Sequence, residues 1–112
     1  MYPVLFSEKA QSDLDSILDY IINKLFNRAA AKRLYEDIER AITYITNTPE
    51  MFPLSGNKRL DMYNVRKANV RGYNMYYLFD GSSVFVIRFM STLSNQSSNM
   101  FVKSIIEIFT RP

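Results

Sequence analysis

The chain has 112 residues, 47% of them hydrophobic, with 8 Tyr and 8 Phe, which is typical of one packed domain over residues 1–112 rather than of a disordered chain. It contains no cysteine and no histidine, which excludes disulfides, a cysteine-ligated zinc site and a Ser-His-Asp triad. Its net charge of +3 is unevenly distributed: residues 1–50 carry −2 and residues 51–112 carry +5. The basic second half indicates either an anionic or acidic partner or simply a basic soluble surface.

The first half of the chain predicts a short strand followed by two helices. Residues 2–6 form the strand, and Pro3 places it near a sheet edge or at a strand start. Ser7 can cap the next helix, in which apolar residues recur at helical spacing from Leu14 to Leu25. Asn27 can cap a second amphipathic helix, which residues 47–49 end. The short break between the helices predicts an antiparallel hairpin.

The second half predicts mainly strands. Residues 49–61 form a loop marked by Pro and Gly. Strands follow at residues 65–70, 73–79 and 84–90, and Asp80-Gly81 is a hairpin signal between the last two. Residues 91–99 are rich in Ser and Asn and predict a loop, after which apolar residues return at helical spacing over residues 101–109.

These elements predict an α+β fold with the order strand–helix–helix–strand–strand–strand. A small antiparallel sheet packs against the N-terminal helical hairpin, a short helical extension follows, and one face of the sheet is left for solvent or a partner. The C-terminal segment can pack in the core, cover the open sheet face, form a homodimer contact or mimic a helix of a partner. We expect no signal peptide, and no apolar run is long enough to span a bilayer.

Basic residues of the second half are interleaved with tyrosines on the predicted sheet, a pattern that suits phosphate and base binding, a protein interface, or a solvated edge. The basic residues are Lys58, Arg59, Arg66, Lys67, Arg71 and Arg88, and the tyrosines are Tyr63, Tyr73, Tyr76 and Tyr77. The candidates for binding a target or a phosphate are Arg66, Lys67, Arg71, Tyr73 and Arg88. The candidates for a catalytic role are Arg71 and Arg88.

Arg88 is unusual because it lies inside the apolar run VFVIRFM, on the expected strand face of Val84, Val86 and Met90. A charge in that place is costly unless it is paired or lies at a functional surface. Asp80, Glu36 or a carboxylate of a partner could pair with it. The acidic residues Asp13, Asp15 and Asp19 are expected on the surface without a metal, and Glu36, Asp37, Glu39 and Arg40 are expected on a solvated helix face with local ion pairs.

The order of these segments resembles the RelE/ParE toxin superfamily of type II toxin–antitoxin systems. The resemblance covers about residues 2–90 and is carried by FSEKAQSDLDSILDYIINK, by NTPEMFP and by VRKANVRGYNMYYLFDGSSVFVIRFM. NVRKANV is similar to the family pattern G-L-R-x-x-x-V and VFVIRFM to V-x-I-[IL]-R-[VI]-[LM], which places Arg66 and Arg88 on family arginines.

The resemblance implies a small cytoplasmic bacterial toxin that an acidic antitoxin neutralises, without a metal or an organic cofactor. RelE-like members cleave mRNA on the ribosome, whereas ParE-like members poison DNA gyrase. Many relatives follow the last strand with H-G-x-R-D or Y-G-x-R-D, but this chain has STLSN at residues 91–95, so residues 91–112 form a divergent extension. Asn74 lies about where mRNA-cleaving relatives carry an arginine.

These departures favour a ParE-like toxin, involved in plasmid stabilisation, over a metal-independent, RelE-like mRNA endoribonuclease. RNA cleavage needs a base, an acid and stabilisation of charge, and the sequence shows no tuned group for proton transfer. A third interpretation is an inactive family member that acts only as a binding module.

Overall fold

A computed structural model describes residues 1–93, 101 and 104–106 of the chain. Its elements in chain order are the strand β1 (Val4–Phe6), the helix α1 (Glu8–Asp19), the π-helical turn η1 (Tyr20–Lys24), the helices α2 (Arg28–Asn47) and α3 (Lys58–Asp61), and the strands β2 (Arg66–Val70), β3 (Tyr73–Phe79) and β4 (Val84–Ser91). This confirms the predicted α+β fold class. Within the described residues, no helix is both long enough and apolar enough to cross a membrane.

Both predicted helix caps are confirmed. The Ser7 hydroxyl accepts a hydrogen bond from the Ala10 amide at 3.0 Å and donates one to the Ile87 carbonyl at 2.8 Å, so it also joins α1 to the sheet. The Asn27 side chain accepts from the Ala30 amide at 3.0 Å. Between the helices, η1 widens the end of α1 and Phe26 takes a positive φ of 50°, which reverses the chain into the hairpin.

The sheet has the strand order β1-β4-β3-β2 and is mixed rather than antiparallel. The strands β2, β3 and β4 pair antiparallel as predicted, but β1 runs parallel to β4, with Val4 opposite Val84. The prediction of an all-antiparallel sheet was wrong for β1. Its neighbour in the sheet is β4, which is not joined to it by a hairpin turn, so the two strands are free to run parallel. The edge position predicted from Pro3 is confirmed, and the Pro3 carbonyl accepts from the Val84 amide at 2.9 Å.

A β-bulge in β4 changes which side chains share a face. Tyr76 pairs with Arg88 and Tyr77 pairs with Val86, so Ile87 is an extra residue on β4. Before the bulge, Val84 and Val86 face the helical hairpin. After it, Phe89 does so, whereas Met90 packs on the opposite side. The predicted common face of Arg88 with Val84, Val86 and Met90 was therefore wrong, because strict alternation does not continue through a bulge.

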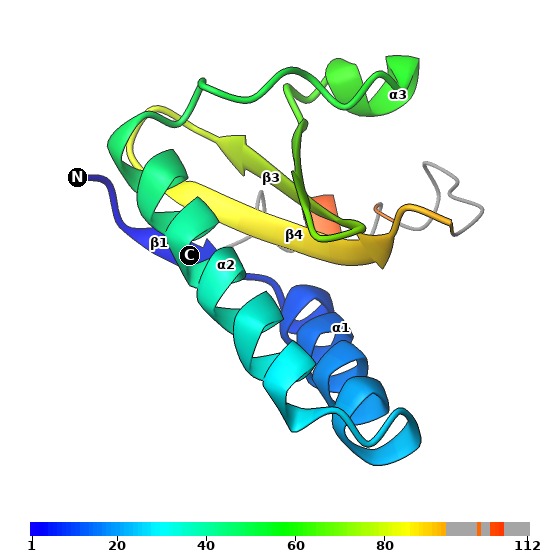
Figure 1. Cartoon of the computed structure of the whole chain (residues 1–112). Coiled ribbons are helices and arrows are strands. Elements are labelled where there is room, and N and C mark those ends of the chain that lie inside the picture. Colours follow the sequence, from blue (N-terminus) through cyan, green and yellow to red (C-terminus); the bar gives the residue numbers. More distant parts are fainter. Residues whose placement is uncertain (94–100, 102–103, 107–112) are drawn as a thin grey trace.

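Hydrophobic clusters cover both faces of the sheet. Figure 1 shows α1 and α2 side by side on one face, where they bury Leu34, Ile38 and Ile45 against the strands. On the other face, Tyr76, Leu78, Phe85, Ile87 and Met90 pack with Leu60, Val65, Phe101 and Ile105. The expectation of an open sheet face was wrong, because α3 and the C-terminal segment supply the apolar cover.

The helix α3 lies within residues 49–61, which were predicted to be only a loop. Asn57 caps it by accepting hydrogen bonds from the amides of Arg59 and Leu60, at 3.0 and 3.2 Å. The turn buries Leu60 against β3 and β4. A helix of four residues is stabilised by its cap and its one buried side chain. It is too short for apolar residues to recur at helical spacing, so the sequence pattern does not predict it.

Among the last described residues, Phe101 is buried with its ring 4.7 Å from the Tyr76 ring, and Ile105 is buried beside it. Core packing is thus confirmed for these two side chains. The predicted apolar residues Val102 and Phe109 lie outside the described residues, and a homodimer contact through this segment stays a prediction.

Replacing two buried serines, Ser104 and Ser7, with alanine should change the free energy of unfolding in opposite directions. Ser104 is fully buried and its hydroxyl has no hydrogen-bond partner among the described residues, whereas the Ser7 hydroxyl makes two hydrogen bonds. We expect Ser104→Ala to raise the free energy of unfolding by about 1 kcal/mol, because it removes an unsatisfied polar group. Ser7→Ala should lower it by about 1–2 kcal/mol through the lost cap. Urea denaturation followed by circular dichroism measures both, and equal losses in the two variants would contradict this reading.

Candidate functional site

Arg88, a predicted site residue, forms a largely buried ion pair with Asp13 of α1. Its Nε and Nη2 donate to Asp13 Oδ2 and Oδ1 at 2.7 and 2.9 Å, and Asp13 Oδ2 also accepts from the Phe89 amide at 3.1 Å. The side chains are only 9% and 14% exposed. Neither Asp80 nor Glu36 is this partner, and Asp13 is not the surface residue that was expected. The pair joins α1 to β4 just past the end of the pairing with β1.

Arg66 is held by the loop that precedes β2. Its Nη1 donates to the Phe52 carbonyl at 2.7 Å and to the Glu50 carbonyl at 3.4 Å, and its Nη2 lies 3.7 Å from the Glu50 carboxylate. Because the guanidinium binds main-chain carbonyls, Arg66 fixes the loop on the edge of the sheet, where Leu54 bridges to it.

Lys67 lies on the opposite side of β2 from Arg66, because successive side chains of a strand alternate. With Ser55, Asn57, Tyr76 and Phe101 it lines a polar cavity of about 250 Å³. Lys67 and Arg66 therefore do not belong to one surface.

Arg71 is the predicted residue that is most clearly presented to solvent. It forms a two-residue turn with Gly72 between β2 and β3, and both residues have positive φ, at 49° and 85°. Its Nε donates to Asp37 of α2, whose other carboxylate oxygen accepts from Arg40 Nη1 at 2.6 Å. The side chains of Arg71 and Arg40 are 52% and 59% exposed. One carboxylate thus orients two guanidinium groups, which leaves a local charge of +1.

The divergent segment after β4 lies beside this turn. Tyr73 pairs with Ser91, and the Thr92 amide and hydroxyl both donate to the Gly72 carbonyl, at 2.9 and 3.0 Å. Ser94 and Asn95, the end of STLSN, lie outside the described residues. The start of STLSN, Ser91 and Thr92, therefore lies next to the turn that carries Arg71.

We call the surface formed by Asp37, Arg40, Tyr44, Asn69 and Arg71 the Arg71 surface; these residues line a shallow hollow of about 260 Å³ between α2 and the end of β2. Of the five predicted site residues, Arg71 lies on it and Tyr73 lies beside it. Sequence reasoning missed Arg40, Tyr44 and Asn69 as members. The i, i+4 spacing of Arg40 and Tyr44 on an exposed helix face was the available signal.

The carboxyl group of Asp37, at the centre of the Arg71 surface, has a shifted pKa. Hydrogen bonds from Arg71 and then Arg40 lower the pKa of Asp37 below its ordinary value. Burial raises the pKa of Tyr77, whose hydroxyl donates to the Pro49 carbonyl at 2.8 Å. Backbone amides of Ser82 and Ser83 lower the pKa of Asp80. The shift of Asp37 moves its pKa away from pH 7, so this carboxylate stays ionised and orients the two guanidinium groups, an arrangement that suits binding of an anionic or carbonyl-rich partner.

The lowered pKa of Asp37 predicts how the Arg71 surface depends on pH. A carboxylate whose pKa is lower in the folded state stabilises the fold above its ordinary pKa of 3.8, and this stabilisation is lost as the pH falls through the folded value. We expect the pair with Arg71 to persist from pH 8 to pH 5. In an NMR titration, Arg71→Ala should raise the pKa of Asp37 toward its ordinary value. An unchanged pKa in this variant would contradict the assigned pairing.

The chain matches the model of a known protein family and resembles a solved structure. The model that describes the ParE toxin of the type II toxin–antitoxin system parDE matches residues 4–95, most of the chain. The chain belongs to the ParE toxin family. It is also similar in fold to a chain of the chromosomal ParDE TA system from P. aeruginosa, with a TM-score of 0.65 and 17% identity, over 81% of this chain and 96% of that chain. No curated protein matches the sequence.

Membership of the ParE family confirms the predicted resemblance to the RelE/ParE superfamily. It also confirms that the chain is closer to ParE-like than to RelE-like members. The family match ends at residue 95, so Phe101 and Ile105, which cover the second sheet face, lie beyond the part that the ParE family model describes. The Arg71 surface lies within the matched part.

Proposed function

We propose that this ParE family member is the toxin of a type II toxin–antitoxin system and that it inhibits bacterial growth by poisoning DNA gyrase. The observation that carries the proposal is the Arg71 surface, an exposed pair of guanidinium groups on a turn that lies within the family match. Exposed arginine beside tyrosine is typical of side chains that anchor a protein contact. We propose Arg71, Arg40 and Tyr44 as the target-binding residues.

The chemistry of the Arg71 surface favours binding over RNA cleavage. Attack by a 2′-hydroxyl on a phosphate needs a general base and a general acid, whereas arginine supplies only charge stabilisation. Ser91, Thr92 and Leu93 add no imidazole, phenol or carboxylate beside Arg71, and the one carboxylate on the surface, Asp37, is bound by Arg71 and Arg40. The two guanidinium groups and Tyr44 would also suit a phosphate and a base, which keeps the RelE-like mRNA endoribonuclease as a second candidate.

The proposal includes two further points. An acidic antitoxin neutralises the toxin in the bacterial cytoplasm, which the similarity to a ParDE toxin–antitoxin system supports. Arg66 and Arg88 stabilise the fold and do not bind the target directly, which is supported by their contacts with loop carbonyls and with Asp13.

Induced expression in bacteria without an antitoxin tests the proposed function. We expect growth arrest with induction of the DNA-damage response and with intact mRNA. Cleavage of ribosome-bound mRNA without DNA damage would support the endoribonuclease instead. Normal growth in the presence of folded, soluble protein would show that the chain is an inactive binding module.

A further inference from the structure

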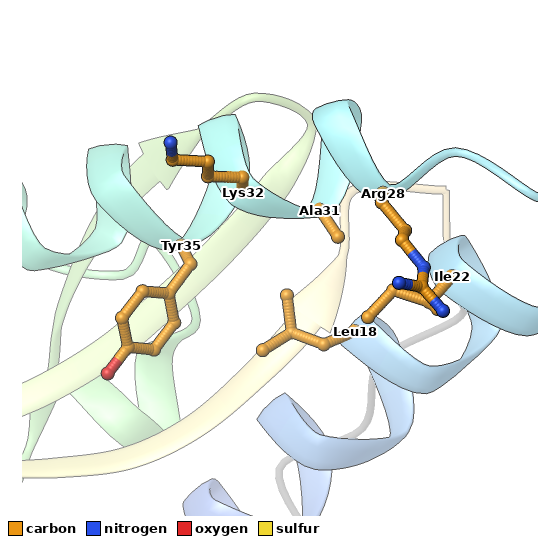
Figure 2. Close-up of a pocket in the computed structure, with 6 residues that line it drawn as sticks. All are labelled: Leu18, Ile22, Arg28, Ala31, Lys32 and Tyr35. Atoms are coloured by element: carbon orange, nitrogen blue, oxygen red, sulfur yellow. The ribbon is translucent and has the colours of Figure 1, made fainter.

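A groove of about 550 Å³ runs between the two long helices of the hairpin, away from the Arg71 surface. Figure 2 shows that Leu18 and Ile22 from α1 and η1 face Ala31 and Tyr35 from α2, with Arg28 and Lys32 along the rim. The pairs Leu18/Ile22 and Ala31/Tyr35 each have i, i+4 spacing, so they form an apolar strip about one helical turn long.

Two further exposed apolar residues lie at the end of the hairpin, which is away from the sheet (Figure 1). Leu25 and Phe26 join η1 to α2 and are 55% and 87% exposed, although both are large apolar residues. Phe26 also has the left-handed backbone that bulky residues rarely adopt. An exposed apolar groove with an exposed leucine and phenylalanine at the same hairpin is typical of a contact surface.

Charge along the groove changes sign from one end to the other. The exposed cations Arg28 and Lys32 lie at the hairpin end. The exposed acids Asp15, Glu36 and Glu39 lie toward the sheet, three or four residues from Leu18, Lys32 and Tyr35, and therefore on the same helix faces. Within the described residues, none of these five charged side chains forms an ion pair.

This polarity decides which occupant the groove fits. A uniformly acidic helix would be attracted to Arg28 and Lys32 but repelled by Asp15, Glu36 and Glu39, and a uniformly basic helix would meet the opposite conflict. An antiparallel copy of the same hairpin matches both ends. At 1.5 Å per residue, Arg28 lies about 8 Å from the middle of the groove on one side, and Glu39 and Asp15 lie about 9 and 8 Å from it on the other.

We propose that the groove is a homodimer interface in which two hairpins pack antiparallel across a two-fold axis. The axis passes through the groove, so that Arg28 of each copy faces Glu39 and Asp15 of the other. In such an isologous contact every pair occurs twice, and the four helices form a bundle. The apolar strips supply the affinity, while the rim charges fix the antiparallel orientation. This interface differs from a contact through the C-terminal segment, whose Phe101 and Ile105 are buried within the chain.

Charge reversal with rescue tests this interface without the target or the antitoxin. The measurement is the molar mass of the full chain in size-exclusion chromatography with light scattering, over a range of concentrations. We expect the wild type to reach twice the chain mass of 13.1 kDa. Arg28→Glu and Glu39→Arg should each raise the dimer dissociation constant by about tenfold or more. The double variant should recover part of the lost affinity, because the pair of residues 28 and 39 attracts again with reversed charges while Asp15 keeps its negative charge.

Two controls separate this interface from a loss of folding. Arg28 is the first residue of α2, where glutamate is favourable to the helix, so Arg28→Glu should retain the wild-type circular dichroism. Lys58→Glu, on the exposed side of α3, should leave the dimer unchanged. A wild type that stays at 13.1 kDa, or a double variant as weak as the single ones, would overturn the proposal. A monomeric chain whose antitoxin binding is weakened by Arg28→Glu would instead assign the groove to the antitoxin.

Discussion

Replacing Arg88 with alanine should lower the free energy of unfolding by about 3–5 kcal/mol. The substitution removes both guanidinium hydrogen bonds from Asp13 and leaves its carboxylate, 14% exposed, with the Phe89 amide as its remaining partner among the hydrogen bonds described above. A carboxylate that loses its partner in a mostly buried position costs far more than an exposed pair does. Urea denaturation followed by circular dichroism measures the loss.

Variants of Asp13 and Arg88 separate the ion pair from a functional role. Arg88→Lys keeps the charge but loses the two-pronged contact, so it should be destabilised by an intermediate amount. In a double-mutant cycle, Asp13→Ala combined with Arg88→Ala should cost less than the sum of the single variants. If Arg88→Ala abolished growth arrest with no loss of stability, Arg88 would belong to the target-binding site after all.

Replacing Arg71 with glutamate should abolish growth arrest while the protein remains folded. The substitution places a carboxylate beside Asp37, which reverses the charge of the Arg71 surface and removes the group proposed to anchor the target. We expect the affinity for the target to fall by about tenfold or more. Because the Arg71 side chain is 52% exposed, the melting temperature should change little. Growth after induction and a thermal melt of the purified variant measure the two effects.

Two matched variants make this test specific to the Arg71 surface. Arg40→Glu changes the other cation on Asp37 and should also weaken growth arrest. Lys58→Glu makes the same charge change on α3, away from this surface, and should leave growth arrest intact. Full toxicity of Arg71→Glu would show that the target binds elsewhere on the molecule.

Local signals in the sequence predicted most of the fold. The strand β3 spans Tyr73–Phe79 as predicted, and Ser7 and Asn27 cap their helices as predicted, because capping and alternation act within a few residues. The direction of β1 was not predictable in the same way. It depends on which strand lies beside it, and the partner β4 is about 80 residues away in the chain.

The candidate site was less predictable because it depends on contacts between distant segments. One extra residue, Ile87, changes the faces of β4, and no local pattern marks that bulge. Asp13 was expected on the surface because it lies in an acidic stretch of α1, yet the packing of α1 along β4 brings it to Arg88. Arg71 was predicted, whereas Arg40 and Tyr44 join it only because α2 crosses the end of β2.

This ParE family member is proposed to bind gyrase through the Arg71 surface and not to cut RNA. A DNA cleavage assay with purified gyrase tests this most directly. Supercoiled DNA, gyrase and the wild-type protein should yield gyrase-dependent double-strand breaks, whereas the Arg71→Glu variant should not produce them. Ribosome-bound mRNA incubated with the same wild-type preparation should stay intact. Cleaved mRNA together with undamaged DNA would contradict the account.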